Sequence, residues 1–318
     1  MARPEAQKRY RHLVQHCTDH IPENTPVISR FAPSPTGYLH LGHIANACFV
    51  WGITRALGGR VILRMEDHDR ERCRPEYETA ILEDLDWLGL EPDLGTLDTW
   101  QKGATIYRQS DCGARYQSAL DKLIAQGRAY ACDCSRKSLS ERLAPGKNDL
   151  VYDGHCRERE LDFAQPDTSV RFCVTPDAVQ FDDLLLGVQV QSPVEQCGDF
   201  PLYDRHGNWT YHLAVVIDDL AQGVNLIIRG EDLLDSTGRQ EQLAMALGRE
   251  TRPFIMHHPL IMDAEGRKLS KRDADTGIRE LREAGCSPET VLGKAAWACG
   301  LLDQEIPLHP GALPELFR

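Results

Sequence analysis

Two histidines in one short segment have the type and spacing to act on a phosphate group. His40 and His43 stand on either side of Gly42, where a loop rich in proline and glycine gives way to a helical pattern. The first turn of a helix has unpaired backbone N–H groups and the positive end of the helix dipole, so it attracts phosphate. Imidazole donors at that position are suited to stabilise the charge that builds up during attack on the α-phosphorus of ATP.

A second cationic segment, Lys268-Leu-Ser-Lys-Arg272, lies far along the chain and is suited to close over the same phosphates. Each segment has a simpler interpretation when it is taken alone. His40 and His43 also match a metal-binding pair or two helix caps, and residues 268–272 also match a solvated basic turn. Because both segments occur together with the Arg30-Phe-Ala-Pro-Ser-Pro-Thr-Gly37 run, we favour the nucleotide-binding interpretation.

The residues around the histidines predict a strand, a helix and a second strand in succession. Residues 27–31 form a short apolar strand, residues 42–57 repeat apolar side chains at helical spacing, and residues 60–66 form the second strand. This order is a βαβ unit, in which ligands bind at the carboxyl ends of the parallel strands. Residues 30–42 and 66–69 both fall at that edge.

The rest of the chain continues the alternation of helix and strand, with one exception. Helical patterns cover residues 71–90, 107–128 and 236–247, and sheet-like patterns cover residues 209–217 and 224–229. Residues 130–200 differ, because they contain short strands, many turn residues and no long helical period. We therefore predict an α/β fold, in which a Rossmann-like parallel-sheet catalytic domain is split by an inserted subdomain.

The predicted domain boundaries follow from these patterns. They are an N-terminal extension (1–24), a split catalytic domain (25–129 and 201–260), an insert (130–200) and a C-terminal region with the cationic loop and helices (261–318).

One group of cysteines in the insert has metal-binding character. Cys132 and Cys134 are separated by one residue, and Cys156 follows downstream near Tyr152 and His155. Three thiolates with a neighbouring tyrosine or histidine can form a tetrahedral zinc site, which would hold together a loop-rich region with little core of its own. The alternative is three unrelated thiols, because the usual CxxC pair is absent. The spacing leaves the fourth ligand open between Tyr152 and His155.

Composition excludes several classes of protein. A net charge of −12 over 318 residues argues against a broad electrostatic nucleic-acid binder, although it leaves room for a local basic patch. No apolar run approaches the roughly 20 residues that a membrane helix needs, and residues 1–24 lack the apolar core of a signal peptide. The remaining cysteines are scattered, which indicates reduced thiols. We expect a cytoplasmic monomer that does not bind membranes.

Five segments together resemble the glutamyl-tRNA synthetases of class I. They are Arg30-Phe-Ala-Pro-Ser-Pro-Thr-Gly37, His40-Leu-Gly-His43, Arg64-Met-Glu-Asp67, Tyr211-His-Leu-Ala-Val-Val-Ile-Asp-Asp219 and Lys268-Leu-Ser-Lys-Arg272. The resemblance covers most of residues 27–275. It is closer to the glutamyl-queuosine tRNA(Asp) synthetases, a family of short paralogues that keep the catalytic core and lack the anticodon-binding domain, because only residues 273–318 follow the last segment.

The resemblance implies a glutamate site, an ATP site and a zinc site. The glutamate-binding residues would be Arg30, Ala32, Ser34, Glu66, Tyr211 and Arg229. The ATP-binding residues would be His40, Gly42, His43 and Lys271, and the catalytic residues would be His40, His43, Lys268 and Lys271. The zinc ligands would be Cys132, Cys134, Tyr152 and Cys156.

The residue types at the implied glutamate site fit an acidic amino acid. Two carboxylates and one ammonium call for guanidinium forks and one acidic group, here Glu66. A buried arginine also rejects glutamine, because a neutral amide would leave its charge unpaired. Taken alone, Arg229 is better explained as a salt-bridge partner of Glu231 and Asp232, and only the resemblance favours a substrate contact. His212 stands where relatives more often carry an amide.

The implied reaction has two steps. The glutamate α-carboxylate attacks the α-phosphate of ATP, which carries Mg²⁺, and the glutamyl group then passes to queuosine at the wobble position of tRNA(Asp). The implied partners are ATP, L-glutamate and queuosine-bearing tRNA(Asp), with one structural Zn²⁺ per chain. Two alternatives remain: a truncated glutamyl-tRNA synthetase that charges a tRNA 3′ end, and a non-catalytic RNA-binding relative. The intact His40, His43, Lys268 and Lys271 argue against the last.

Overall fold

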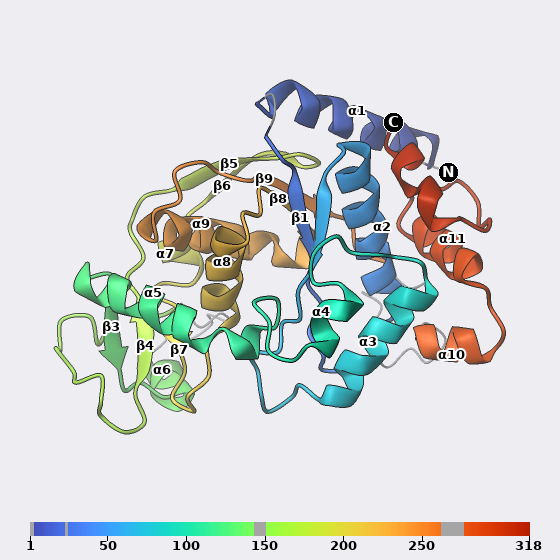
Figure 1. Cartoon of the computed structure of the whole chain (residues 1–318). Coiled ribbons are helices and arrows are strands. Elements are labelled where there is room, and N and C mark those ends of the chain that lie inside the picture. Colours follow the sequence, from blue (N-terminus) through green and yellow to red (C-terminus); the bar gives the residue numbers. More distant parts are fainter. Residues whose placement is uncertain (1–2, 23–24, 143–150, 262–276) are drawn as a thin grey trace.

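The predicted βαβ unit is present in the structure. The computed structural model describes residues 3–22, 25–142, 151–261 and 277–318, whose arrangement is drawn in Figure 1. Strand β1 (Ile28–Phe31) leads to helix α2 (Leu41–Ala56), and strand β2 (Arg60–Leu63) pairs with β1 in parallel. The carboxyl ends of the two strands therefore lie at one edge, as the sequence predicts.

The sheets are mixed, which corrects the predicted parallel sheet. Four further strands form one sheet: β5 (Val179–Asp183), β6 (Gly187–Gln191), β8 (Leu226–Gly230) and β9 (Phe254–His258). β8 and β5 both pair with β9 in parallel, whereas β6 runs antiparallel to β5. A short connection such as the one between β5 and β6 allows only an antiparallel hairpin. β1 lies beside β8, since the N–H of Asn225 donates to the carbonyl of Ile28 at 3.1 Å.

Three predicted helices are present with shorter bounds, and one predicted strand is wrong. The confirmed helices are α3 (Pro75–Trp87), α5 (Gly113–Ala125) and α9 (Thr237–Ala246). The predicted strand at 209–217 is instead part of helix α8 (Tyr211–Ala221), which packs against α5 and α9. Most of this helix is buried, so its run of apolar residues has no period that separates helix from strand. Its β-branched residues favoured the strand interpretation.

The sheets do not follow the predicted boundaries of the 130–200 insert. A three-stranded antiparallel sheet contains β3 (Ala129–Cys132), β4 (Ser169–Phe172) and β7 (Pro201–Tyr203). β7 therefore lies beyond the predicted end at residue 200, while β5 and β6 lie inside the predicted insert but pair in the sheet of β8 and β9. The described part of the segment also contains helices α6 (Arg136–Arg142) and α7 (Pro193–Gln196).

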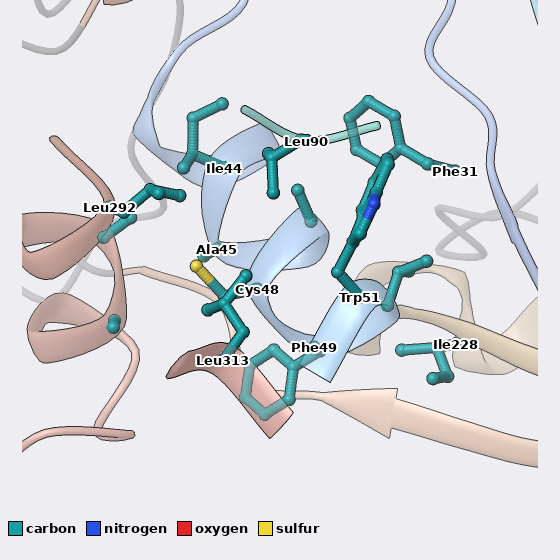
Figure 2. Packing of buried hydrophobic residues seen from close by; sticks show 14 of the residues in the cluster. Phe31, Ile44, Ala45, Cys48, Phe49, Trp51, Leu90, Ile228, Leu292 and Leu313 are labelled. Atoms are coloured by element: carbon teal, nitrogen blue, oxygen red, sulfur yellow. The ribbon is translucent and has the colours of Figure 1, made fainter. Parts of the chain in front are cut away.

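Helix α2 lies at the centre of the main hydrophobic core (Figure 2). The strands cover one side of it, and helices from the C-terminal region cover the other: α11 (Pro288–Ala298) and the 3-10 helix η4 (Pro310–Leu316). A Cβ atom on Gly52 would lie 2.1 Å from the Phe317 ring, so only glycine permits this close approach. The packing fixes α2, and with it the position of His40 and His43 at its first turn.

The predicted N-terminal extension contributes to the same core. Helix α1 (Arg3–His20) places the ring of Tyr10 against Phe49 of α2 and against Phe317, at centroid distances of 5.4 and 6.2 Å. The described part of the C-terminal region is helical, as predicted, with α10 (Ile278–Glu283) before α11. The described residues also include three short helical turns, α4 (Leu97–Gln101), η1 (Gln109–Asp111) and η2 (Glu231–Ser236). Across the described ranges, every helix is too short or too polar to cross a bilayer.

Candidate active site

A cavity of about 290 Å³ lies at the carboxyl ends of β1, β8 and β9. The loop after β1 and the first turn of α2 form one wall, and the residues after β8 and β9 form the other. Its lining includes Ala32, His40, Gly42, His43, Asn46, Asp232 and His258. Three of the predicted ATP-binding residues, His40, Gly42 and His43, therefore lie together at one cavity, at the edge of the sheet where ligands of parallel strands bind.

His40 and His43 cap helix α2 and line this cavity at the same time. Nδ1 of His40 accepts the N–H of Gly42, and Nδ1 of His43 accepts the N–H of His40, both at 3.1 Å. A neutral imidazole whose Nδ1 accepts a hydrogen bond carries its proton on Nε2. Each ring therefore has an N–H donor on the side away from its cap. The helix-cap alternative is therefore correct for the Nδ1 atoms of both residues.

The chain reaches the cavity on both sides of residues 262–276. Ile261 lines the cavity, and Gly277 forms a β-bridge with His40. The N–H of Ile278 also donates to the carbonyl of Leu39 at 3.0 Å. The predicted catalytic residues Lys268 and Lys271 belong to the intervening segment, which lies outside the described residues.

Beside the cavity, a buried ion network joins two of the predicted glutamate-binding residues. Asp219 of α8 accepts from Nε of Arg30 at 3.1 Å and from Nη1 of Arg64 at 2.7 Å. Nη2 of Arg64 donates to Glu66 at 3.2 Å. Burial raises the pKa of Asp219, but Arg30 and Arg64 outweigh this effect and hold that pKa below its ordinary value. The network fixes Arg30 and Glu66 relative to each other.

Arg229 is buried at the end of β8 and has only neutral partners among the described residues. Its Nε donates to Nε2 of His257 at 3.0 Å, its Nη1 to Oε1 of Gln240 at 2.6 Å, and its Nη2 to Oγ1 of Thr237 at 2.9 Å. The salt bridge to the following acidic residues, which the sequence alone favours, is not formed. Burial lowers the pKa of Arg229 because the guanidinium lacks a contacting anion to offset its desolvation.

The remaining predicted glutamate-binding residues lie near these charges. Tyr211 is the first residue of α8. Burial and the negative charge of Glu66 raise its pKa, and the positive charges of Arg229 and Arg30 offset only part of this rise. Oγ of Ser34 donates to the backbone carbonyl of Glu66 at 2.9 Å. Ser34 therefore positions the loop that carries Glu66.

A buried histidine, His258, and a half-buried one, His212, flank these sites. His258 hydrogen-bonds to Asn46 at 2.9 Å and stacks on Phe49, and Nδ1 of His212 lies 3.3 Å from Nε2 of Gln240. Burial lowers the pKa of His258 to about 4 and that of His212 to about 3. Both rings are therefore neutral in the folded protein at neutral pH.

The lowered pKa values of His212 and His258 predict that the protein loses stability in mild acid. In the unfolded chain a histidine takes a proton below about pH 6.5, whereas in the folded protein His212 and His258 stay neutral to much lower pH. Their contribution is complete above that pH and is lost as the pH falls toward the folded pKa values. We expect the free energy of unfolding to fall by up to about 1.4 kcal/mol per pH unit for each histidine.

Urea unfolding between about pH 7.5 and about pH 5 measures this slope. His212→Gln should reduce it, whereas the same change at the exposed His16 should leave it unaltered. An identical slope in wild type and His212→Gln would contradict the explanation.

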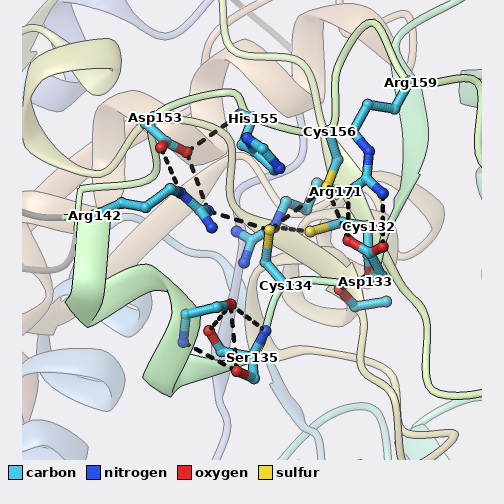
Figure 3. A network of polar contacts seen from close by, with 12 residues as sticks. Cys132, Asp133, Cys134, Ser135, Arg142, Asp153, His155, Cys156, Arg159 and Arg171 are labelled. Carbon is cyan, nitrogen blue, oxygen red and sulfur yellow. Dashed lines mark hydrogen bonds and ion pairs between the residues drawn. The ribbon is translucent and has the colours of Figure 1, made fainter.

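Three of the predicted zinc ligands, Cys132 at the end of β3 and Cys134 and Cys156 between β3 and β4, lie together (Figure 3). The sulfur atoms of Cys132, Cys134 and Cys156 all lie within 4.8 Å of one another and are buried. The hydroxyl of Tyr152 lies 3.4 Å from the Cys132 sulfur and 3.9 Å from the Cys134 sulfur. His155 is exposed and is not part of this cluster. The geometry therefore favours Tyr152 over His155 as the fourth donor.

Each of the three sulfur atoms also accepts a hydrogen bond from an arginine, and all three arginines are labelled in Figure 3. Nε of Arg171 donates to Cys132 at 3.2 Å, Nη2 of Arg142 to Cys134 at 3.2 Å, and Nη1 of Arg159 to Cys156 at 3.4 Å. The Arg171 guanidinium also lies 3.9 Å from the centre of the Tyr152 ring. Burial raises the pKa of Cys132, but hydrogen bonds from Tyr152 and Arg171 outweigh this effect and lower that pKa, which favours the thiolate form that binds zinc. Burial raises the pKa of Cys156 to about 11.

Several residues of these sites were not predicted from the sequence. They are Asn46, Asp232 and His258 in the cavity, and Arg64 and Asp219 in the ion network. Asp232 lies just after the end of β8, and His258 is the last residue of β9. Because ligands bind at the carboxyl ends of parallel strands, these positions could have predicted both residues as part of the site. Asn46 lies within α2, and only the fold shows which face of that helix lines the cavity.

Comparison with known proteins identifies the family of the chain. Residues 26–297 match the family described as tRNA synthetases class I (E and Q), catalytic domain. The chain belongs to this family. It is therefore an enzyme of the class I aminoacyl-tRNA synthetases, as its sequence predicts, and the cavity at the carboxyl ends of the strands is the candidate active site of a synthetase catalytic domain.

Individual relatives of this class I synthetase differ in length. A glutamyl-Q tRNA(Asp) synthetase from Symbiobacterium thermophilum is 41% identical over 307 residues, which cover 91% of each chain. A glutamate–tRNA ligase 1 from Nitrosococcus oceani is 39% identical, but the match covers 88% of this chain and 58% of that protein. The crystal structure of a glutamate tRNA ligase from Elizabethkingia meningosepticum, in complex with its amino acid, gives a TM-score of 0.72 at 28% identity, covering 86% of this chain and 60% of that one.

Proposed function

We propose that this synthetase activates glutamate with ATP and transfers the glutamyl group to queuosine at the wobble position of tRNA(Asp). The glutamate assignment rests on the buried guanidinium groups of Arg30 and Arg229. These two groups and the carboxylate of Glu66 all lie close enough to Tyr211 to affect its pKa. The fork of Arg229 matches one carboxylate of glutamate, Arg30 offers the other carboxylate the charge that it shares with Asp219, and Glu66 matches the ammonium. A glutamine amide would leave one buried guanidinium without its anion, so the site selects against glutamine.

In the activation step the protein positions the reactants and stabilises charge. The Nε2–H groups of His40 and His43 donate to the phosphates of ATP at the first turn of α2, where the helix dipole also favours negative charge. The glutamate α-carboxylate attacks the α-phosphorus, forms a P–O bond and expels pyrophosphate. Mg²⁺ accompanies ATP, and Lys271, assisted by Lys268, neutralises the leaving group. Arg30, Arg229 and Glu66 hold the amino acid in line for this attack.

We also propose that Cys132, Cys134, Tyr152 and Cys156 hold one structural Zn²⁺. The fit of these donors supports the assignment, because three buried sulfur atoms and one phenol oxygen form a compact set with cationic hydrogen-bond donors around it. The hydrophobic cluster at this place consists of the four donors themselves and a few partly buried neighbours. Zinc would supply the cross-link that such a small core lacks.

The choice of queuosine as acceptor rests on the relatives, because the chain matches 91% of a protein that carries the glutamyl-Q tRNA(Asp) name. The alternative acceptor is a tRNA 3′ end, which a glutamate–tRNA ligase uses. Glutamyl transfer to three RNAs separates the two: tRNA(Asp) with queuosine, tRNA(Asp) without it, and tRNA(Glu).

We expect transfer to queuosine-bearing tRNA(Asp) only, with a signal at least about 100-fold above the other two RNAs because the attacking hydroxyl is absent from them. Transfer should persist when the 3′-terminal adenosine of the tRNA is replaced by 2′,3′-dideoxyadenosine, which removes the hydroxyls of the 3′ end and leaves the diol of queuosine intact. Equal glutamylation of tRNA(Glu) would reject queuosine as the acceptor and favour 3′-end charging.

A further inference from the structure

Arg229 differs from the other buried arginines near the cavity in the charge of its partners. Arg30 and Arg64 each contact the carboxylate of Asp219 directly. The guanidinium of Arg229 instead donates hydrogen bonds to the imidazole of His257, the amide oxygen of Gln240 and the hydroxyl of Thr237. Neutral acceptors thus take three of its five N–H donors, and the phenol of Tyr211, also neutral, contributes a further contact.

The imidazole of His257 separates the guanidinium of Arg229 from the carboxylate of Asp183. Because Nε2 of His257 accepts from Arg229, the proton of this imidazole is on Nδ1, which donates to Oδ2 of Asp183 at 2.7 Å. Asp183 also accepts the backbone N–H groups of His257, Leu185 and Leu186, at 3.0, 2.9 and 2.9 Å. The charge of Asp183 is therefore satisfied by these donors, and it orients His257 without an ion pair to Arg229.

We propose that Gln240, Thr237 and His257 form a neutral shell that fixes the Arg229 fork while leaving its charge available to a carboxylate of the substrate. Gln240 is the residue that determines this property, because its Oε1 makes the shortest contact to the guanidinium. The inference rests on the proposed function, since the anion that Arg229 awaits is glutamate.

The physical basis is competition for one cation. An aspartate or glutamate in direct contact with Arg229 would form a charge-assisted hydrogen bond, and the substrate carboxylate would have to displace or share it. Neutral acceptors hold the geometry of the fork through weaker hydrogen bonds and do not cancel its charge. The desolvation cost of the unpaired guanidinium is then recovered when the substrate binds.

The test compares Gln240→Glu with Gln240→Met. The glutamate side chain has the shape of glutamine and keeps an acceptor for Nη1 of Arg229, but it adds a negative charge. Methionine removes the acceptor and adds no charge. We expect Gln240→Glu to raise the KM for glutamate in ATP–pyrophosphate exchange by about 10-fold or more, and Gln240→Met by about threefold or less. The KM for ATP should stay within about twofold in both.

A merely structural role for Gln240 predicts the opposite order, because Gln240→Glu restores the hydrogen bond to Arg229 and Gln240→Met does not. The melting temperature of Gln240→Glu should equal or exceed that of wild type, since it adds an ion pair, and this measurement also shows that the variant folds. Gln126→Glu, the same charge change at an exposed position after α5, is the matched control and should leave the KM for glutamate unchanged.

The outcomes separate the inference from the proposed function. Exchange in wild type, with an equal KM for glutamate in Gln240→Glu, overturns the neutral shell and leaves glutamate activation intact. A larger KM in Gln240→Met than in Gln240→Glu also overturns it. Absence of glutamate-dependent exchange in wild type overturns the proposed function, and the neutral shell with it.

Discussion

Replacement of Arg229 by leucine is expected to weaken glutamate activation severely. The guanidinium is buried, is fixed by Thr237, Gln240 and His257, and has no carboxylate partner among the described residues. A substrate carboxylate would therefore lose both a cation and its hydrogen bonds in a buried site. Losses of this kind reach about 4 kcal/mol, so kcat/KM for glutamate should fall by about a thousand-fold.

Steady-state pyrophosphate exchange measures this effect. Arg229→Lys keeps the charge but not the planar fork, so we expect it to lie between wild type and Arg229→Leu. Arg60→Leu, at an exposed position at the start of β2, should behave as wild type. A kcat/KM for Arg229→Leu within about threefold of wild type would mean that Arg229 does not contact the amino acid.

Replacement of Cys132 by serine is expected to remove zinc and to unfold the region between β3 and β4. Cys132 is fully buried, and its sulfur is near the hydroxyl of Tyr152 and the guanidinium of Arg171. Serine is a poor zinc ligand, and the surrounding cluster has little apolar material of its own. Binding of a structural zinc supplies on the order of 10 kcal/mol of folding free energy, so its loss should melt this region well before the rest of the chain.

Metal analysis of the purified protein and limited proteolysis measure the two effects together. Wild type should contain one zinc per chain, whereas Cys132→Ser should contain almost none and should be cleaved rapidly between β3 and β4. Cys286→Ser, outside this cluster, is the matched control and should keep its zinc. A wild-type protein without zinc, or a Cys132→Ser protein with a full complement, would reject the proposed ligand set.

The parts of the fold that were predictable have strong local patterns. The βαβ unit follows from an apolar strand, a proline and glycine loop, and a helix whose apolar residues recur over 16 residues. The strand edge then brings Arg30, Glu66 and the two histidines of α2 to one place, because ligands of parallel strands gather at their carboxyl ends. Motif spacing therefore locates the cavity well.

The parts that were missed depend on long-range packing. Helix α8 is covered on several sides, so its sequence has no face that identifies it as a helix. The partners of Arg229 come from α9 and β9, which no local pattern connects to β8, and the nearby Glu231 and Asp232 suggested a salt bridge that the fold does not form. The arginines around Cys132, Cys134 and Cys156 were likewise invisible, because they come from three separate segments.

A crystal structure of the protein with a non-hydrolysable glutamyl-adenylate analogue tests the placement of both substrates in one measurement. We predict the adenylate in the cavity between the first turn of α2 and His258, with its phosphate position within hydrogen-bonding distance of Nε2 of His40 or His43. The glutamyl carboxylate should contact a guanidinium of the Arg30 and Arg229 pair, with its ammonium toward Glu66. An analogue bound away from this cavity, or one whose glutamyl group faces neither arginine, would contradict glutamate activation at this site.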